Sequence, residues 1–599
     1  MISRFWKKSE VLMNGTIAVS LYRSTRSRLV VAIGDVPGPL VKGCISFVTE
    51  TDCDDGLPHT LEHLVFMGSK KYPYKGVLDV IANRCLASGT NAWTDQDHTA
   101  YTLSTVRNFH KKYYHLSNMM VTVSGRVNHE RLLKIIETAE EEHLAEIPES
   151  FQRPFVSLHL KPVAESSEHR VVCPSDDESR GSVEMSWFGH RPTDFQEKVA
   201  FDVLFDYMSN TPVSPLQREF VLIEKPLASQ VSFHVTEQME KHPATQLFGH
   251  MIGHQLYDEN DDQLKVRMDE LELIRRLRSE PASFWSGLVK KYFTSPHVVV
   301  VGVPSEKMVE QVAKEEKTRL DKQRKELGKE GIKECGEKIE AAIKENTAKK
   351  PSAEVLNELI VRKLEEFDRF PVDMKSNRGG SPSSQPIAKF LDQFPFPTTV
   401  HNCPTKFVEL FFLFDTSILT VEQRAMLDVY TELLFESPAK INGVVKSAEE
   451  VSKLYTKVDA ETGFPNLAKW AEIFTVGVVF DIQRVKQCAK KLASDAREKK
   501  RDGSAVANSA LCTLIYHPNT NGYMYDDLIL EKFNEKIAKD CDSKPKEVLD
   551  RLEELRLALF SHGVNAHLLC NVDLIDSKQF EPVQWSFAEK FYGNAEKFK

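Results

Sequence analysis

The 599-residue sequence has no apolar run near the roughly 20 residues that a membrane-spanning helix needs. Its longest apolar runs, such as 297–303, are only as long as a β-strand. Residues 1–14 include a few basic side chains but no apolar core of a signal peptide. We therefore expect no membrane insertion and no secretion, and we predict a cytoplasmic protein.

The sequence also has too little positive charge for a nucleic-acid-binding protein. Its formal net charge is -9, and phosphate binding needs concentrated Lys and Arg. The ten cysteines include no C-x-x-C pair, so we expect reduced thiols. No phosphate loop, dinucleotide-binding fingerprint or Gly-x-Ser-x-Gly elbow is found. These absences argue against nucleic acid, nucleotides and serine-hydrolase chemistry.

What the sequence does have is a His-x-x-Glu-His motif, with His59, Glu62 and His63. Residues four apart share one face of a helix, so both imidazoles can reach one metal ion while Glu62 stays close to a metal-bound water. This order is the inverzincin signature. The pentapeptide by itself is half of a zinc hydrolase site.

The flanking sequence places this motif at the start of a short helix. Residues 29–33 and 43–49 are rich in β-branched side chains and predict strands. The turn residues before Pro58, and a proline in the first helical turn, are typical of a helix start. Downstream, residues 99–105 alternate between apolar and polar and predict a further strand.

Three ordered blocks, 56–69, 86–94 and 97–101, closely resemble the pitrilysin and insulin-degrading-enzyme family of zinc metallopeptidases. The resemblance implies a Zn²⁺ cofactor held by His59 and His63, with Glu62 as the general base. It implies a peptide or unfolded polypeptide as the partner. The net charge and the lack of long apolar runs predict no nucleic acid or membrane partner, and the oligomeric state stays open. The resemblance also implies a substrate-binding strand that includes Asn91, Ala92, Thr99 and Tyr101.

The third zinc ligand of that family, a second Glu, has no clear counterpart here. Glu140 lies at a suitable distance along the chain. However, residues 109–127 resemble the helix and strand that follow the third ligand in the family. Glu140 then belongs to the next helix, 128–143, whose Glu-rich face we expect to be solvated.

An internal repeat leads to the same conclusion independently. Lys111-Lys112-Tyr113-Tyr114 precedes a strand and a helix, and Lys290-Lys291-Tyr292-Phe293 does the same. In the second copy, a long segment with a helical stretch at 263–278 separates the strand 231–235 from the Lys-Lys-Tyr sequence. The first copy has only a few residues between 105 and 111, so we infer that its block of helices is missing.

Two His ligands alone should hold zinc weakly, because catalytic zinc sites usually have three protein ligands. We therefore predict an impaired zinc metalloendopeptidase, in which Glu137 or Glu140 could act as a replacement ligand. The alternative is a catalytically inactive peptidase-fold binding or scaffold protein. A skipped exon or a gene-model gap would also explain the missing helices. His98, His562 and His567 are read as structural residues.

The predicted fold class is α+β, with about three repeated domains that each pack a mostly antiparallel sheet against helices. The first domain, 1–160, carries the motif and is shortened, and the second is 168–315. A charged helix and a linker with a Gly/Ser-rich segment at 379–384 occupy 316–387. The third domain, 388–580, is partial, and a fourth domain expected from the large members of the family is absent.

Overall fold

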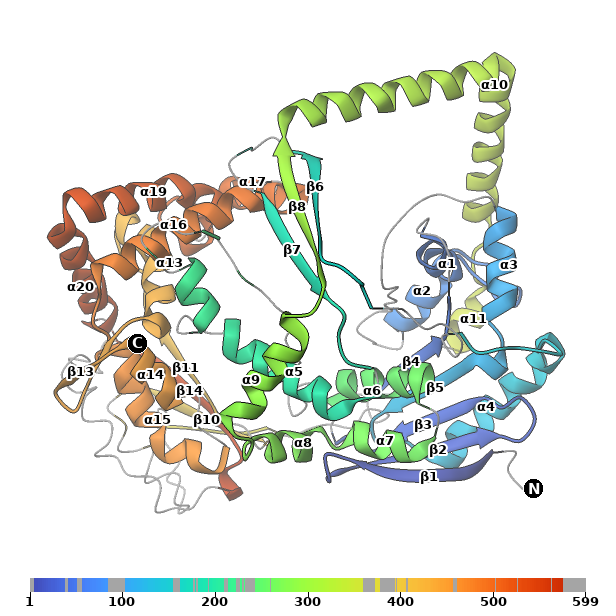
Figure 1. Ribbon diagram of the computed structural model, residues 1–599, viewed down its shortest axis with the longest axis horizontal. Helices are drawn as coiled ribbons and strands as arrows, with labels where there is room; N and C mark the ends of the chain where they lie inside the picture. The colour runs from blue at the N-terminus through green and yellow to red at the C-terminus, as the bar shows by residue number, and fades with distance from the viewer. Residues whose placement is uncertain are drawn as a thin grey trace. The chain divides into compact units, whose positions relative to one another are not determined.

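The computed structural model describes residues 5–37, 41–50, 56–84, 103–154, 162–175, 178, 181–191, 193–209, 214–221, 223, 227–228, 231, 243–258, 260–358, 372–377, 391, 394, 396–403, 405, 408–455, 460–500, 502–524, 526–561 and 563–574. The chain forms two compact units. Unit 1 comprises Met1–Leu204 and Thr236–Arg369, and unit 2 comprises Phe205–Val235 and Phe370–Lys599. Figure 1 labels their elements.

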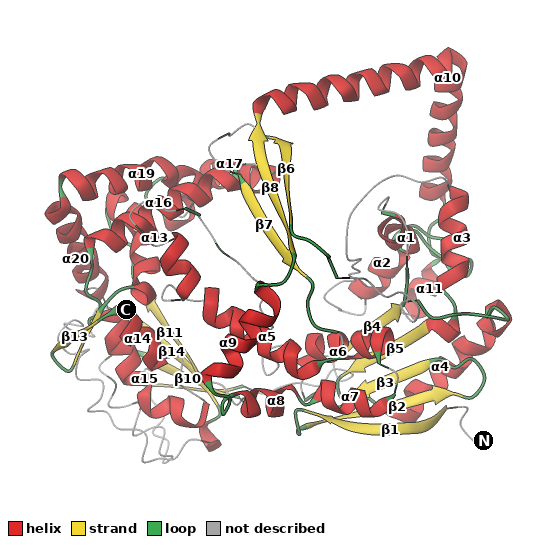
Figure 2. Cartoon of the chain, viewed as in Figure 1, coloured by secondary structure: helices red, strands yellow, loops and turns green. Residues whose placement is uncertain are grey.

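The strands fall into four sheets, and Figure 2 shows them among a larger number of helices. The first sheet contains β1 (Phe5–Met13), β2 (Ile17–Ser24), β3 (Val30–Gly34), β4 (Lys42–Phe47) and β5 (Met119–Ser124). The second contains β6 (Ser167–Pro174), β7 (Ser182–Trp187) and β8 (His297–Ser305). Unit 2 holds the third and fourth: β9 (Asp373–Ser376), β10 (Thr398–Asn402), β11 (Glu409–Phe414) and β14 (Val564–Cys570), then β12 (Ala439–Ile441) with β13 (Val444–Lys446).

The α-helices of unit 1 are α1 (Leu57–Val65), α2 (Val77–Arg84), α3 (Leu103–Tyr113), α4 (His129–His143), α5 (Phe195–Ser209, which runs into unit 2), α6 (Pro243–Tyr257), α7 (Asp261–Met268), α8 (Glu270–Leu277), α9 (Ala282–Phe293), α10 (Glu306–Ala348) and α11 (Ala353–Glu358). Those of unit 2 are α13 (Val421–Glu436), α14 (Ala448–Tyr455), α15 (Ala460–Thr475), α16 (Ile482–Lys499), α17 (Gly503–Ile515), α18 (Asn521–Met524), α19 (Asp527–Ser543) and α20 (Pro545–Ser561). Among the described residues, no helix combines the length and apolarity needed to cross a bilayer. The fold class is α+β, as predicted.

The three larger sheets share one connection pattern. In the first, β5 lies between β3 and β4, parallel to β3 and antiparallel to β4. In the second, β8 lies in the same way between β6 and β7. In unit 2, β14 lies in the same way between β10 and β11. The middle strand of each sheet follows a helix: β5 follows α3, β8 follows α9 and β14 follows α20. The repeat inferred from the two Lys-Lys-Tyr sequences is therefore a structural repeat.

Helices cover both faces of the first sheet. On one face, Leu133 of α4 packs with Leu29, Val31 and Ile33 from the sheet. On the other face, the sheet residues Val11, Met13, Val19, Leu21, Ala32 and Met120 pack against α6 and α7. Leu247 and Met251 of α6 and Leu264 and Met268 of α7 are all fully buried there. Two helices from the second repeat therefore complete the core of the first.

The fit between α6 and the first sheet is close. A Cβ at Gly34 would lie 2.5 Å from Cδ2 of Leu247, so the glycine lets the helix approach the strand. Polar contacts fix the same interface, because the side-chain amide of Gln255 donates to the carbonyl of Asn118 at 2.8 Å. The predicted stretches 1–160 and 168–315 thus share a core.

The second sheet, β6–β8–β7, has much less cover. Nearly every residue of β6 and β7 is exposed, including Val172 at 49% and Val183 at 66%. In the described part, the ring of Trp187 at one end of this sheet meets Phe293 of α9 edge-on, and β6 also contacts α10. The helices that pack on the first sheet are therefore not available to cover this one.

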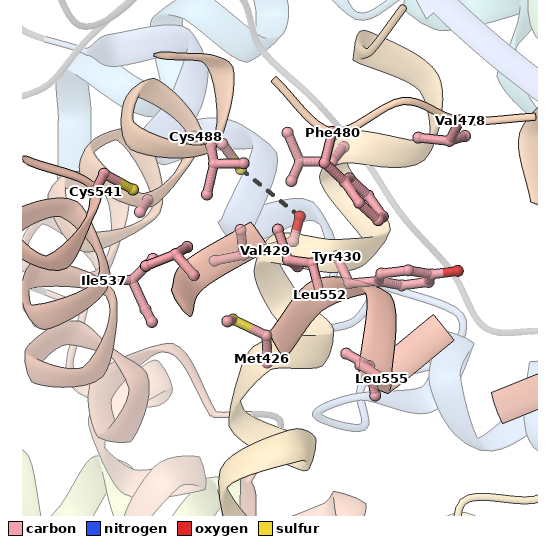
Figure 3. Packing of buried hydrophobic residues seen from close by; sticks show 14 of the residues in the cluster. Met426, Val429, Tyr430, Val478, Phe480, Cys488, Ile537, Cys541, Leu552 and Leu555 are labelled. Atoms are coloured by element: carbon pink, nitrogen blue, oxygen red, sulfur yellow. Dashed lines mark hydrogen bonds between the residues drawn. The ribbon is translucent and has the colours of Figure 1, made fainter. Parts of the chain in front are cut away.

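One large core cluster of unit 2 lies among four helices, α13, α16, α19 and α20, and another lies around β10 and β14. Figure 3 shows side chains of the four-helix cluster, among them Met426, Val429, Ile537, Leu552 and Leu555. The thiol of Cys488 donates to the carbonyl of Val429 at 3.9 Å (Figure 3). The cysteines that the structure describes are free thiols, which agrees with the expectation from the sequence.

Most predicted elements in the described residues are found, with two differences. The strand predicted at 99–105 is wrong at its end, because 103–105 are the first residues of α3. The helix predicted at 263–278 is two helices, α7 and α8, which meet at the non-helical Asp269. The predicted strand 231–235, apart from Val231, and the linker 379–384 lie outside the described residues.

We predict that the contact of α7 with the first sheet determines the stability of unit 1. Leu264 is fully buried in this contact, whereas Val266 on the same helix is 46% exposed. Leu264→Ala should lower the free energy of unfolding by about 2–5 kcal/mol. Val266→Ala should change it by about 0.5 kcal/mol or less. Urea unfolding of both variants checks this, and equal effects would contradict it.

We also predict that unit 1 loses stability in mild acid because of His250 on α6. Burial, with help from the charges of Lys198 and Arg267, lowers the pKa of His250 to about 4. The imidazole of His250 therefore binds a proton more tightly in the unfolded chain than in the folded protein. The free energy of unfolding falls as the pH drops from about 6.5 toward about 4.

His250→Gln should make the fall in unfolding free energy between these pH values shallower, by up to about 1.4 kcal/mol per pH unit. The matched control is His169→Gln, because His169 is exposed on β6. The prediction fails if both variants show the wild-type slope in urea unfolding at pH 7, 6, 5 and 4.5.

Candidate metal centre

The motif lies on α1, as predicted from the sequence. Gly56 precedes the helix in the left-handed conformation, with φ 70°, which glycine adopts at little cost. Pro58 is in the first turn, where a missing N–H costs nothing. Leu57 and Leu61 are buried, and this places His59, Glu62 and His63 on the remaining faces of the helix.

The two histidines of the motif point at the same position. Nε2 of His59 and Nε2 of His63 are 3.1 Å apart, and the ring centroids are 4.8 Å apart. Two nitrogens that share a tetrahedral zinc ion at the usual bond lengths lie about 3.3 Å apart. His63 is exposed and His59 is half-buried, so the shared position is open to solvent on one side. The pair therefore fits a zinc ion as two of its ligands.

Helix α1 is held in place by α3. Leu57 and Leu61 pack against Phe109 and Tyr113, which lie one turn apart on α3. The Tyr113 hydroxyl donates to the carbonyl of Glu50 at 2.8 Å, and this ties α3 to the segment that leads into α1. The orientation of the motif therefore depends on the Lys-Lys-Tyr segment of the first repeat.

Tyr114 is a residue of this site that the motif analysis missed. Its ring is stacked on Phe47 of β4, with centroids 4.4 Å apart, and on His110 of α3, with centroids 5.0 Å apart. Burial raises the pKa of the Tyr114 phenol, and the charge of Glu62 raises it further. Tyr114 thus lies within electrostatic range of the expected general base. The sequence signal was its place at the end of the repeated Lys-Lys-Tyr segment.

The described residues contain no third ligand beside the two histidines. No group of three or more His, Cys, Asp or Glu side chains suited to a metal occurs in the described part of the chain. Neither Glu137 nor Glu140, both in α4, therefore joins His59 and His63 as a replacement ligand.

Glu140 has a structural role instead. It is 1% exposed, and one carboxylate oxygen accepts hydrogen bonds from the hydroxyls of Ser24 and Ser27. Its predicted position on a solvated helix face is therefore wrong. Amphipathic spacing located helix α4 correctly. It could not show that Ser24 at the end of β2 and Ser27 in the following turn would bind the carboxylate of Glu140.

Several predicted residues lie outside the described part of the chain. These are the four residues of the expected substrate strand, Asn91, Ala92, Thr99 and Tyr101, together with His98 and His562. His567 on β14 is described, and its Nδ1 is 2.9 Å from Nε2 of His401 on β10. This pair of stacked imidazoles is not part of any larger ligand group that the structure describes.

The second repeat has a different set of groups at the corresponding place. Glu197, in the first turn of α5, pairs with Lys291 at 2.5 Å and accepts a hydrogen bond from Tyr292. These side chains line a cavity of about 410 Å³, together with Phe188 and His190. The second repeat thus places an ion pair where the first places two histidines.

Comparison with protein families agrees with this geometry. The profile of "Insulinase (Peptidase family M16)" matches residues 48–140, and the profile of "Peptidase M16 inactive domain" matches residues 100–263. A Caenorhabditis elegans protein described as uncharacterised is 43% identical, and the match covers 98% of this chain and 76% of that protein. The chain belongs to the M16 peptidase family.

More distant M16 relatives are similar over most of the chain or over a short part of it. An uncharacterised Saccharomyces cerevisiae protein is 24% identical over 93% of this chain and 72% of its own length. The mitochondrial presequence protease of Schizosaccharomyces pombe is 44% identical over 62 residues, which are 10% of this chain and 6% of that protease. The crystal structure of pitrilysin matches with a TM-score of 0.39 and 11% identity, covering 98% of this chain and 74% of that one.

The long alignments also bear on the missing helices. The alignment with the C. elegans protein extends over 763 positions, and that with the S. cerevisiae protein over 757. Both are longer than this chain of 599 residues. These two relatives therefore have internal residues that have no counterpart here.

We predict that Glu140 stabilises the fold and has no part in metal binding. Glu140→Ala leaves two buried serine hydroxyls without their acceptor and should cost about 1–3 kcal/mol of unfolding free energy. It should leave the zinc content of the folded protein unchanged. Glu141→Ala, which removes an exposed ion pair with Arg26, should cost about 1 kcal/mol or less. Loss of zinc in Glu140→Ala but not in Glu141→Ala would contradict the prediction.

Proposed function

We propose that this chain is an impaired zinc metalloendopeptidase that binds peptides or unfolded polypeptides and hydrolyses them slowly. The observation that carries the proposal is the approach of the two Nε2 atoms of His59 and His63 to 3.1 Å on the helix that also carries Glu62. M16 membership supports peptide hydrolysis as the ancestral reaction.

The impairment follows from the number of ligands. Two imidazoles supply half of a tetrahedral shell, whereas catalytic zinc sites usually have three protein ligands and a water. Glu140 is occupied by Ser24 and Ser27, and the described residues supply no other group at the site. A zinc ion held by two ligands should dissociate readily, so most molecules would be empty at low zinc concentration.

When zinc is bound, it would polarise the peptide carbonyl and lower the pKa of its water. The residues of the chain would do the rest. His59 and His63 would hold the ion, and Glu62 would take a proton from the water as its oxygen bonds to the carbonyl carbon. Glu62 would then pass that proton to the amine that leaves as the C–N bond breaks. The exposed side of the histidine pair leaves room for a peptide.

A second function, peptide binding without hydrolysis, is supported by the match of residues 100–263 to the inactive-domain profile of the M16 family. A binding or scaffold protein would keep the fold and the peptide-accommodating surface and would not need the zinc ion. The first function requires Glu62 as the general base, whereas peptide binding alone does not.

The test is zinc content and peptide cleavage measured on the full-length chain. After loading with zinc and desalting, the wild type should keep well under one zinc per chain. His59→Ala should keep less, because it removes one of the two ligands. Glu62→Gln should keep as much zinc as the wild type but lose at least about 100-fold of any cleavage of an unstructured fluorogenic peptide.

His169→Ala serves as the control for adventitious zinc, because His169 is exposed and lies on the second sheet. It should match the wild type in both zinc content and cleavage. One zinc per chain with rapid cleavage would show an intact site and overturn the impairment. No cleavage in the wild type, with peptide binding retained in Glu62→Gln, would favour the binding function.

We propose a cytoplasmic location, because the ten cysteines include no C-x-x-C pair and those that the structure describes are free thiols, as in a reducing compartment. The name of the presequence proteases places those relatives in mitochondria, but their similarity covers only 10% of this chain. Subcellular fractionation of the tagged full chain tests this, and recovery with mitochondria would contradict it. We also propose that neither nucleic acid nor membrane is a partner, in line with the net charge of -9.

A further inference from the structure

The cavity of the second repeat has no part in the proposed function. Its volume of about 410 Å³ is within the usual range of small-molecule sites. Its walls come from the segment after β7, the start of α5, the end of α9 and residues 162–163 (Figure 1). All of these residues belong to unit 1, so the cavity forms within one compact unit.

One wall of the cavity carries charges that are already paired. Lys291 of α9 lies 2.5 Å from the carboxylate of Glu197, and the hydroxyl of Tyr292 donates to the same carboxylate. Burial raises the pKa of Glu197, but the bonds from Lys291 and Tyr292 outweigh this effect and lower the pKa overall. Glu197 therefore stays ionised and bound to Lys291, and this group has little charge left to offer to a ligand.

A second pair of opposite charges on the cavity wall is open. The backbone N–H of Asp194 donates to the carbonyl of Arg191 at 2.9 Å, which keeps the two residues within one turn of each other. Both residues are exposed. The carboxylate of Asp194 accepts a single long bond, from the N–H of Glu197 at 3.4 Å. The guanidinium of Arg191 has no bonding partner in the part of the chain that the structure describes.

His190 adds a hydrogen-bonding group to this wall. Its Nδ1 lies 2.9 Å from the carbonyl oxygen of Arg191, an arrangement in which Nδ1 carries the proton and donates. Nε2 of the neutral ring is then an acceptor. The ring is held in place by Phe201 of α5, with the two centroids 5.6 Å apart.

Apolar side chains form the rest of the wall. Phe188 is 41% exposed and Val163 is 37% exposed, and both line the cavity. Pro162 and Pro296 line it as well. Apolar groups in a concave wall beside a few polar groups are typical of a site that holds a small molecule with an apolar body.

We propose that this cavity binds a free α-amino acid with an apolar or aromatic side chain. The carboxylate of the ligand pairs with the guanidinium of Arg191. Its ammonium pairs with the carboxylate of Asp194 and donates to Nε2 of His190. Its side chain packs on the ring of Phe188. This site does not depend on the zinc centre.

The two open charges favour a zwitterion over other small molecules. A ligand with one charge would leave either Arg191 or Asp194 without a partner. A peptide carries its terminal charges at opposite ends, too far apart for two residues within one turn of each other. An α-amino acid holds both charges on one carbon atom, which matches this spacing.

The experiment is equilibrium dialysis of the full chain against labelled L-phenylalanine, with unlabelled analogues as competitors. N-acetyl-phenylalanine lacks the ammonium, phenylalanine amide lacks the carboxylate charge, and glycine lacks the side chain. We expect saturable binding of L-phenylalanine at a single site. Each analogue should compete at least about 10-fold more weakly, because each loses one charged or apolar contact.

Substitution of Arg191 tests where the carboxylate lies. Arg191→Gln should weaken binding of L-phenylalanine by at least about 10-fold. It should leave the weaker binding of phenylalanine amide unchanged, because that ligand has no carboxylate to lose. The matched control is Arg170→Gln, because Arg170 is exposed on β6 and does not line the cavity. The control should bind L-phenylalanine as the wild type does.

Gly189 provides a second test, because a larger residue there fills the cavity. Gly189 lines the cavity, and a Cβ added to it would meet no atom within 4 Å. Gly189→Leu should therefore abolish binding and leave urea unfolding close to that of the wild type. The matched control is Gly287→Leu, at an exposed position of α9 where an added Cβ also meets no atom within 4 Å.

Three outcomes would overturn the proposal. Absence of saturable binding would mean that the cavity holds no free amino acid. Equal competition by N-acetyl-phenylalanine or by phenylalanine amide would identify one end of a peptide as the ligand instead. Binding that persists in Gly189→Leu would place the ligand outside this cavity.

Discussion

The structure of unit 1 depends on how the second face of the first sheet is covered. A sheet whose both faces are apolar must bury both, and here α6 and α7 supply the second cover through four fully buried side chains. The glycine at position 34 lets α6 approach closely, and the amide of Gln255 donates to the carbonyl of Asn118, just before β5. The motif helix α1 is connected to this same sheet through α3 and β5.

Because α6 and α7 pack on the first sheet, they leave the sheet of the second repeat exposed. The β6–β8–β7 sheet has the same connections as the first, yet its outer strands are almost wholly exposed. Helices that cover one sheet cannot cover another. In the described part of the chain, the second sheet therefore does not have the two-sided cover that the first sheet receives.

The metal centre combines contacts of short and of long range in the sequence. The histidine pair needs only a short helix and its contacts with α3, so it survives with near-ideal spacing. The third ligand needs a longer-range element, and the carboxylate that lies nearest to the required sequence position, Glu140, instead satisfies two serine hydroxyls. A buried carboxylate with two donors has no reason to leave them for a metal ion at an open site. The chain therefore combines a sound ligand pair with an incomplete shell.

The sequence by itself determined the features that depend on short-range spacing. These are the motif helix, the strands of the repeats and the repeated Lys-Lys-Tyr segments, because periodicity and turn residues act within a few positions. Tertiary structure decided the rest. Glu140 is buried because serines over a hundred residues away bind it, and α6 covers the first sheet because Gly34 admits it. Tyr114 joins the site only because β4 and α3 pack together. Such contacts join residues distant in the chain, and no local pattern encodes which of several apolar faces will meet.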